Sequence, residues 1–101
     1  MKILTVCGNG IGSSLMLAMK IREICEENNI KADVESSDFA SAQGKKADLI
    51  ITIKQLGSQI ESTPVCTVRS YVNKKKIIED TLDTIKAMYE KEKAEKQNKK
   101  N

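Results

Sequence analysis

The chain has 101 residues, 40% of them hydrophobic but only 3% aromatic, which is the composition of one small domain with a mainly aliphatic core. Its formal net charge is +3, of which residues 90–101 supply +2 through five lysines and three glutamates, so the body lacks the basic stripe that nucleic-acid binding requires. The chain has no histidine, three scattered cysteines and no long apolar run or signal-peptide pattern, so we expect a cytoplasmic domain without a metal, a cofactor, a disulfide framework or membrane insertion.

The first half of the chain predicts a strand, a helix, a second strand and a short helical turn. Residues 2–6 form an aliphatic, β-branched run, and residues 13–27 follow with helical periodicity. Residues 32–35 predict the second strand, and Asp38 can cap a helical turn that Gly44 ends. The apolar residues of the first helix share one face, which we expect to pack on a sheet: Leu17, Ala18, Ile21, Ile24 and Cys25.

The second half predicts two more strands and a final helix. Residues 48–53 are nearly continuously apolar, which is typical of a strand buried on both faces of a parallel sheet. Pro64 precedes a fourth strand at residues 65–68, and Asn73 can cap a helix. That helix carries an apolar stripe formed by Ile78, Leu82, Ile85 and Tyr89. We expect one domain at residues 1–89, followed at residues 90–101 by a charged tail that frays into solvent.

Strands that alternate with helices indicate a three-layer α/β fold, in which helices flank a four-stranded parallel sheet. Ligands in such folds bind beyond the carboxyl ends of the strands. Cys7 follows the first predicted strand at such an end, whereas Cys25 and Cys66 fall on a helix face and in a strand, where cysteine is ordinarily a small buried apolar residue.

The loop that follows the first strand holds three of the chain's five glycines. Its residues are Cys7, Gly8, Asn9, Gly10, Ile11, Gly12, Ser13 and Ser14. Alternating glycines allow several N–H groups to turn inward and form an anion-binding cup that leads into a helix N-terminus. A cysteine at the mouth of that cup gains thiolate character, so we predict that Cys7 is the nucleophile and that Gly8 to Ser14 bind phosphate. The serines could also serve only as helix caps, and Asn9 could only shape the loop.

Other phosphate-binding motifs fail at specific positions. A dinucleotide fingerprint would need glycine at Ser13 or Leu15, and a Walker loop would need serine or threonine at Lys46. A low-molecular-weight tyrosine phosphatase pattern, C-x₅-R-S/T, would need arginine at Ser13 to hold the phosphate dianion. That class also uses an aspartate before proline as an acid, whereas the only proline here follows Thr63. Hydrolysis is therefore a disfavoured alternative.

The loop sequence V-C-G-N-G at residues 6–10, followed by G-S-S at residues 12–14, resembles the active site of one protein family. It is similar to the sugar-specific IIB components of the bacterial phosphotransferase system (PTS), in particular the ascorbate-type branch of the lactose/ascorbate/galactitol IIB superfamily. The resemblance extends more loosely to Tyr89. It implies that Cys7 accepts phosphate from a histidine of a IIA protein and passes it to sugar at a membrane IIC permease.

Positive side chains near the carboxyl ends of the strands have two interpretations. Lys54 and Arg69 follow the third and fourth strands, where they could attract phosphate or an acidic partner, or could be ordinary solvated charges. Lys74, Lys75 and Lys76 stand at the start of the final helix, where positive charge is unfavourable, so they could contact a partner. Two other functions stay open: a regulatory module that senses an anion and a redox-sensing thiol, the second disfavoured because no resolving cysteine is near in sequence.

Overall fold

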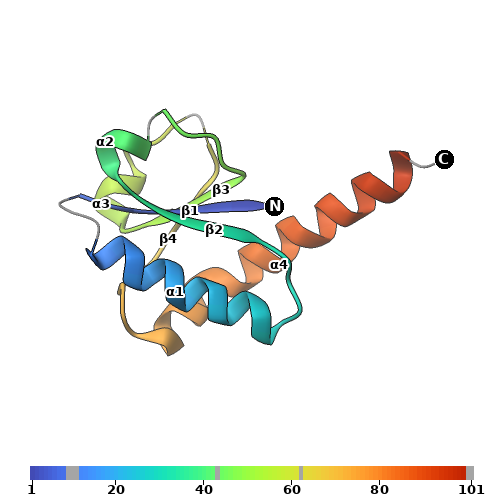
Figure 1. Cartoon of the computed structure of the whole chain (residues 1–101), viewed down its shortest axis with the longest axis horizontal. Helices are drawn as coiled ribbons and strands as arrows, with labels where there is room; N and C mark the ends of the chain where they lie inside the picture. Colours follow the sequence, from blue (N-terminus) through green and yellow to red (C-terminus); the bar gives the residue numbers. More distant parts are fainter. Residues whose placement is uncertain (9–11, 43, 62, 100–101) are drawn as a thin grey trace.

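Four parallel strands form one sheet in the order β2-β1-β3-β4 in a computed structural model of the chain, which describes residues 1–8, 12–42, 44–61 and 63–99. The strands are β1 (Lys2–Cys7), β2 (Asp33–Asp38), β3 (Leu49–Thr52) and β4 (Val65–Thr67). The helices are α1 (Gly12–Glu27), α2 (Phe39–Ala42), α3 (Lys54–Gly57) and α4 (Lys74–Lys99). Helices α1 and α4 cover one face of the sheet and the short α2 and α3 lie on the other (Figure 1). The predicted three-layer fold is therefore confirmed.

Residues of β1 alternate between the two faces of the sheet, as the pleat requires. Ile3 packs in the core beneath α1 and α4, whereas Leu4 and Val6 pack in the smaller core beneath α2 and α3. Along the neighbouring strand β2 the register runs from Lys2 opposite Asp33 to Cys7 opposite Asp38. Cys7 is therefore the last residue of a central strand, at the carboxyl edge of the sheet.

The predicted inner face of α1 is confirmed in full. All five of its apolar residues are at most 2% exposed: Leu17, Ala18, Ile21, Ile24 and Cys25. The helix ends at Glu27, and Asn29 follows with a φ of 57°, the left-handed conformation that asparagine tolerates at the end of a helix.

Strand β2 is longer than the sequence predicts. Instead of residues 32–35 it spans Asp33–Asp38, because its pairing with β1 continues through Ser36 and Ser37 as far as Cys7. Serine and aspartate have low strand propensity, but pairing with a neighbouring strand outweighs propensity in a sheet. The Oδ1 atom of Asp38 then accepts a hydrogen bond of 3.3 Å from the Ser41 N–H, which confirms the predicted cap of α2.

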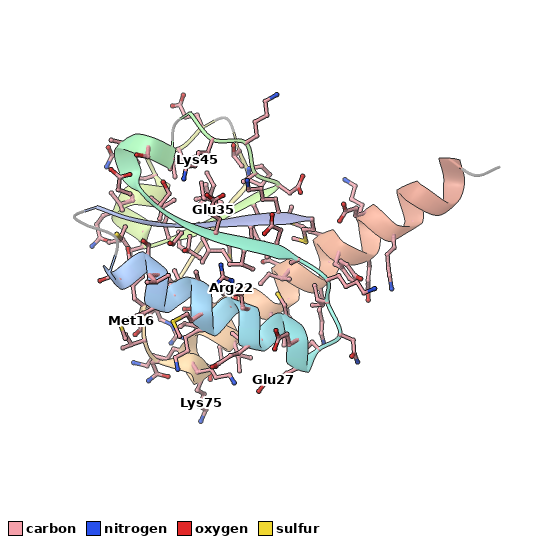
Figure 2. All side chains as sticks on the ribbon, viewed as in Figure 1. Met16, Arg22, Glu27, Glu35, Lys45 and Lys75 are labelled. Atoms are coloured by element: carbon pink, nitrogen blue, oxygen red, sulfur yellow. The ribbon has the colours of Figure 1, made fainter. Side chains whose placement is uncertain are left out.

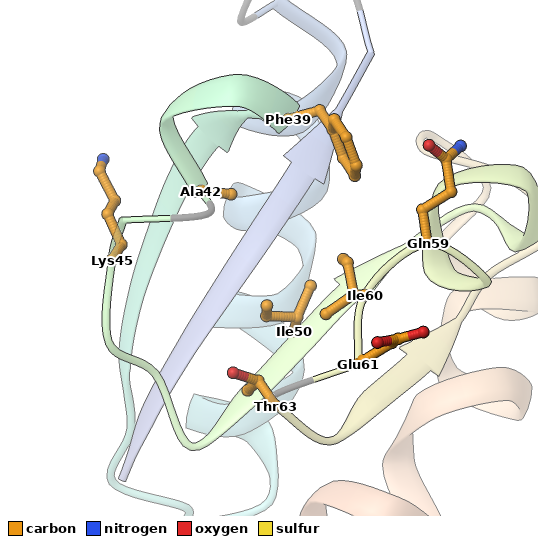
Figure 3. Close-up of a pocket in the computed structure, with 8 residues that line it drawn as sticks. All are labelled: Phe39, Ala42, Lys45, Ile50, Gln59, Ile60, Glu61 and Thr63. Carbon is orange, nitrogen blue, oxygen red and sulfur yellow. The ribbon is translucent and has the colours of Figure 1, made fainter.

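The face of the sheet under α2 and α3 carries the smaller of the two cores. A cavity of about 370 Å³ opens there over Ile50 of β3 (Figure 3). It is lined by Phe39, Ala42, Lys45, Ile50, Gln59, Ile60, Glu61 and Thr63.

The buried face of α4 is displaced from the predicted stripe. Ile77, Thr81 and Ile85 are fully buried, whereas Ile78, Leu82 and Tyr89 are only partly buried at the margin of the core. The apolar pattern did not indicate this face because Thr81 is polar, yet its hydroxyl donates to the Ile77 carbonyl at 2.7 Å and so is satisfied within the helix.

Helix α4 continues past the expected end at Tyr89 as far as Lys99. Alanine, glutamate, lysine and glutamine favour helix even without an apolar stripe, and the N-terminal amine of Met1 pairs with Glu92 at 3.3 Å. Residues 90–99 are therefore part of a helix that extends beyond the body (Figure 1), and fraying of this end stays a prediction. The domain boundary at residue 89 stays a prediction. None of the helices that the structure describes combines the length and apolarity that a bilayer crossing requires.

The cap of α4 provides a stability test. The Oδ1 atom of Asn73 accepts a hydrogen bond of 3.1 Å from the Lys76 N–H, as the sequence predicted. Asn73→Ala is expected to lower the free energy of unfolding by about 1 kcal/mol, because it removes this acceptor, whereas Asn73→Asp should retain it. Urea denaturation of the two variants measures the difference, and equal losses would show that the cap is not what stabilises the helix start.

Candidate functional site

Cys7 and the start of α1 lie at the carboxyl edge of the sheet. The Cys7 side chain is 3% exposed, Gly8 and Ser13 are exposed, and Ser14 is fully buried. The hydroxyl of Thr5 donates to the Ser14 carbonyl at 2.7 Å, which fixes the first turn of α1 against β1. The structure therefore places Cys7 and Gly8 at the carboxyl end of β1 and Gly12, Ser13 and Ser14 in the first turn of α1, which Thr5 ties to β1. The predicted loop residues Asn9, Gly10 and Ile11 lie outside the described residues.

Packing within the protein does not require glycine at either described loop position. A Cβ atom added to Gly8 would meet only Leu56, at 3.9 Å, and one added to Gly12 would meet nothing within 4 Å. Neither residue has a φ in the left-handed region, so the feature that the missing side chain leaves is access of an external group to the backbone.

The carbonyl of Val6, just before Cys7, accepts two side-chain hydrogen bonds. The backbone pairs of β1 with β3 end at Thr5 opposite Ile51. One step further, the Thr52 hydroxyl donates to the Val6 oxygen at 2.8 Å and the Tyr71 hydroxyl donates to it at 3.2 Å. A side chain of β3 and one from the segment after β4 thus bond to β1 directly before the cysteine.

Sequence reasoning did not identify Tyr71 as a site residue. Burial raises the pKa of its hydroxyl above the usual value. The phenol contacts the carbonyl of the residue that directly precedes Cys7. The only signal in the sequence is its position after the fourth strand, where parallel sheets place ligand-binding loops.

Lys54 and Arg69, the two basic residues predicted to attract phosphate or a partner, have different environments in the structure. Lys54 is the exposed first residue of α3, close to the end of β3. The guanidinium of Arg69 instead bonds to Glu79 and Asp80 of α4 at 3.0–3.1 Å, and its backbone N–H also donates to Asp80. These carboxylates raise the pKa of Arg69, whose charge in turn lowers the pKa of Asp80. Arg69 therefore links β4 to α4.

Of the three lysines at the start of α4, Lys74 pairs with Glu27 at 2.9 Å and with Glu23 at 3.6 Å, so it ties α4 to α1. Lys75 and Lys76 are exposed. A partner-facing role is therefore left to these two positions.

The other two cysteines lie in the larger core, as predicted. Cys25 is 2% and Cys66 8% exposed, and burial raises the pKa of both thiols. The Cys66 thiol donates to the Asp80 carbonyl at 3.1 Å. A cysteine with a raised pKa inside a core is a poor nucleophile. Cys7 differs from both by its position, as the last residue of the central strand β1.

Comparisons with known proteins show the family of the chain. A family model described as "PTS system, Lactose/Cellobiose specific IIB subunit" matches residues 2–99. The ascorbate-specific PTS system EIIB component of Shigella boydii serotype 4 is 31% identical over 93 residues, covering 87% of this chain and 92% of that protein. The protein with the same description from Mycoplasma pneumoniae is 29% identical over 73 residues, covering 70% and 77%.

A likeness among solved structures concerns the fold alone. The low-molecular-weight protein tyrosine phosphatase from Bacillus subtilis superposes with a TM-score of 0.51 at 16% identity, covering 100% of this chain and 99% of the phosphatase. The two proteins thus share the arrangement of a parallel sheet flanked by helices. On the match across residues 2–99, the chain belongs to the lactose/cellobiose-type IIB family of the phosphotransferase system and is a phosphoryl-carrying component of such a system.

Proposed function

We propose that Cys7 carries the phosphoryl group, that a IIA protein donates it from a phosphohistidine, and that an ascorbate-like sugar bound at a membrane IIC permease receives it. The observation that carries this proposal is the position of Cys7 at the end of a central strand, directly before the loop that leads into α1. The ascorbate-specific relatives at 31% identity support the choice of sugar. Exchange with a IIA protein places the domain on the cytoplasmic side.

The first step transfers the phosphoryl group from nitrogen to sulfur. The Cys7 thiolate attacks phosphorus in line, the S–P bond forms and the N–P bond breaks, and its electron pair returns to the imidazole of the IIA histidine. Loop N–H groups and the N-terminal end of α1 stabilise the charge on the phosphoryl oxygens. Positioning and electrostatics supply most of the catalysis, because the chain contains no histidine to act as a base.

The second step passes the group to oxygen. A sugar hydroxyl attacks phosphorus, the O–P bond forms, the S–P bond breaks, and Cys7 leaves as the thiolate while the hydroxyl proton passes to the permease site or to solvent. A carrier must not let water take the place of the sugar. Ser13 stands where the phosphatase pattern has arginine, and an exposed serine binds a phosphate dianion far less firmly than a bidentate guanidinium does.

A protein donor is favoured by the surface beside the loop. Leu15, Met16 and Met19, in the first half of α1, are 44%, 48% and 54% exposed. Their spacing along the helix places them on one apolar strip, with Met16 directed away from the sheet (Figure 2). Exposed apolar strips of this kind are characteristic of protein contacts, whereas a small phosphate donor would have no use for one.

The decisive experiment is intact-mass analysis after incubation with phosphoenolpyruvate, the general PTS proteins and a IIA protein of the ascorbate branch. We expect a gain of one phosphoryl group, assigned to Cys7 by fragmentation. A IIA protein of the lactose branch serves as the matched comparison and should transfer more slowly. Phosphate on another residue, or none from a demonstrably phosphorylated IIA protein of either branch, would overturn the proposal.

A further inference from the structure

The peptide between Val6 and Cys7 is held from the β3 side by two hydroxyl groups. Thr52 donates to the Val6 carbonyl at 2.8 Å and Tyr71 at 3.2 Å, and both bonds lie beyond the last backbone pair of β1 with β3. Because the peptide unit is planar, fixing the Val6 carbonyl also fixes the N–H and Cα of Cys7. The direction in which the thiol points is therefore tied to these two donors.

Tyr71 itself is held on a short, internally bonded segment. The hydroxyl oxygen of Ser70 accepts hydrogen bonds of 3.1 Å from the backbone N–H groups of Val72 and Asn73, and Asn73 caps α4. The phenol is thus anchored to the start of a long helix rather than to a loose loop. Such an anchor suits a group that must hold another residue in place.

We propose that Tyr71 is a positioning residue for Cys7, which with Thr52 clamps the Val6 carbonyl and so presents the thiol to the incoming phosphoryl group. The proposal rests on the proposed function, in which Cys7 is the phosphoryl acceptor. It assigns a role to a residue 65 positions from Val6 in sequence, on the segment that joins β4 to α4. Tyr71 contributes neither the nucleophile nor the proton, only the orientation.

Phosphoryl transfer tests the clamp directly. Tyr71→Phe keeps the ring and removes the donor, so acceptance from phosphorylated IIA is expected to slow about ten- to a hundredfold in rate constant with little change in KM for IIA. Thr52→Val removes the second donor and should slow transfer in the same way, whereas Thr52→Ser keeps a hydroxyl and should restore most of it. Tyr89→Phe, at the far end of the core, is the matched control and should transfer normally.

Thiol alkylation tests the clamp without any PTS protein. Cys7 is only 3% exposed, so release from the clamp should expose its thiol more often. In Tyr71→Phe it should react with iodoacetamide at least about threefold faster, while Cys25 and Cys66 in the same chain keep their slow rates. Faster alkylation of all three cysteines would mean general loosening of the fold and would overturn the proposal. Wild-type rates of both alkylation and transfer in Tyr71→Phe would overturn it as well.

Tyrosine fluorescence of the folded protein adds a measurement that does not depend on the free energy of unfolding. The chain has two tyrosines and no tryptophan, so the Tyr89→Phe variant reports on Tyr71 alone. Phosphorylation of Cys7 should change the emission of Tyr71. Unchanged emission would contradict the proximity of the phenol to the phosphoryl group. If wild-type protein accepts no phosphate at all, the proposed function fails, and alkylation still decides whether Tyr71 positions Cys7.

Discussion

Cys7→Ser is expected to reduce phosphoryl acceptance from IIA by at least about a thousandfold, because a thiol is partly ionised near neutral pH and a serine hydroxyl is not. The variant should fold normally. Cys7 is only 3% exposed but lies at the carboxyl end of β1, outside the larger core, so we expect the free energy of unfolding to fall by no more than about 1–2 kcal/mol, similar to the decrease in Cys25→Ser. Single-turnover intact-mass kinetics with phosphorylated IIA measures the loss, and circular dichroism with urea denaturation checks the fold.

Cys25→Ser is the matched control for this experiment. Cys25 is 2% exposed on the inner face of α1, and burial raises the pKa of its thiol. A hydroxyl in that apolar environment is expected to lower stability by about 1–2 kcal/mol and to leave transfer intact. If Cys7→Ser unfolded the protein while Cys25→Ser stopped transfer, the two roles would have been assigned to the wrong cysteines.

Features that depend on a short stretch of chain could be predicted from the sequence. The inner face of α1 and the caps at Asp38 and Asn73 rest on spacing or on one side chain and a nearby N–H. The position of Cys7 at the sheet edge followed from the alternation of strands and helices, since parallel strands end on the same side.

Features that depend on contacts between distant segments could not. Nothing near Tyr71 in sequence indicates that its hydroxyl meets Val6, and nothing near Arg69 indicates that Asp80 and Glu79 take its guanidinium. The length of β2 was set by its pairing with β1. These outcomes are decided by which side chains the fold brings together, so a positive charge after a strand is weak evidence for a phosphate site.

Neighbouring residues of β3 offer a test of how the two faces of the sheet are packed. Ile51 is fully buried in the core beneath α1 and α4, whereas Ile50 is 3% exposed beneath α2 and α3. Ile50 also lines the cavity of about 370 Å³, whose rim includes the exposed residues Gln59 and Glu61 (Figure 3). The same type of side chain thus occupies two environments one residue apart.

Ile51→Ala is expected to cost about 4 kcal/mol and Ile50→Ala about 2 kcal/mol in the free energy of unfolding, measured by urea denaturation. Truncation at Ile51 leaves a closed void among rigid neighbours, which cannot move far enough to pack against the shorter side chain. Truncation at Ile50 enlarges a cavity that already opens to the surface, so water and the short helices can partly fill the space. Equal costs would mean that the α2 and α3 face is packed as tightly as the other, and that the cavity closes in solution.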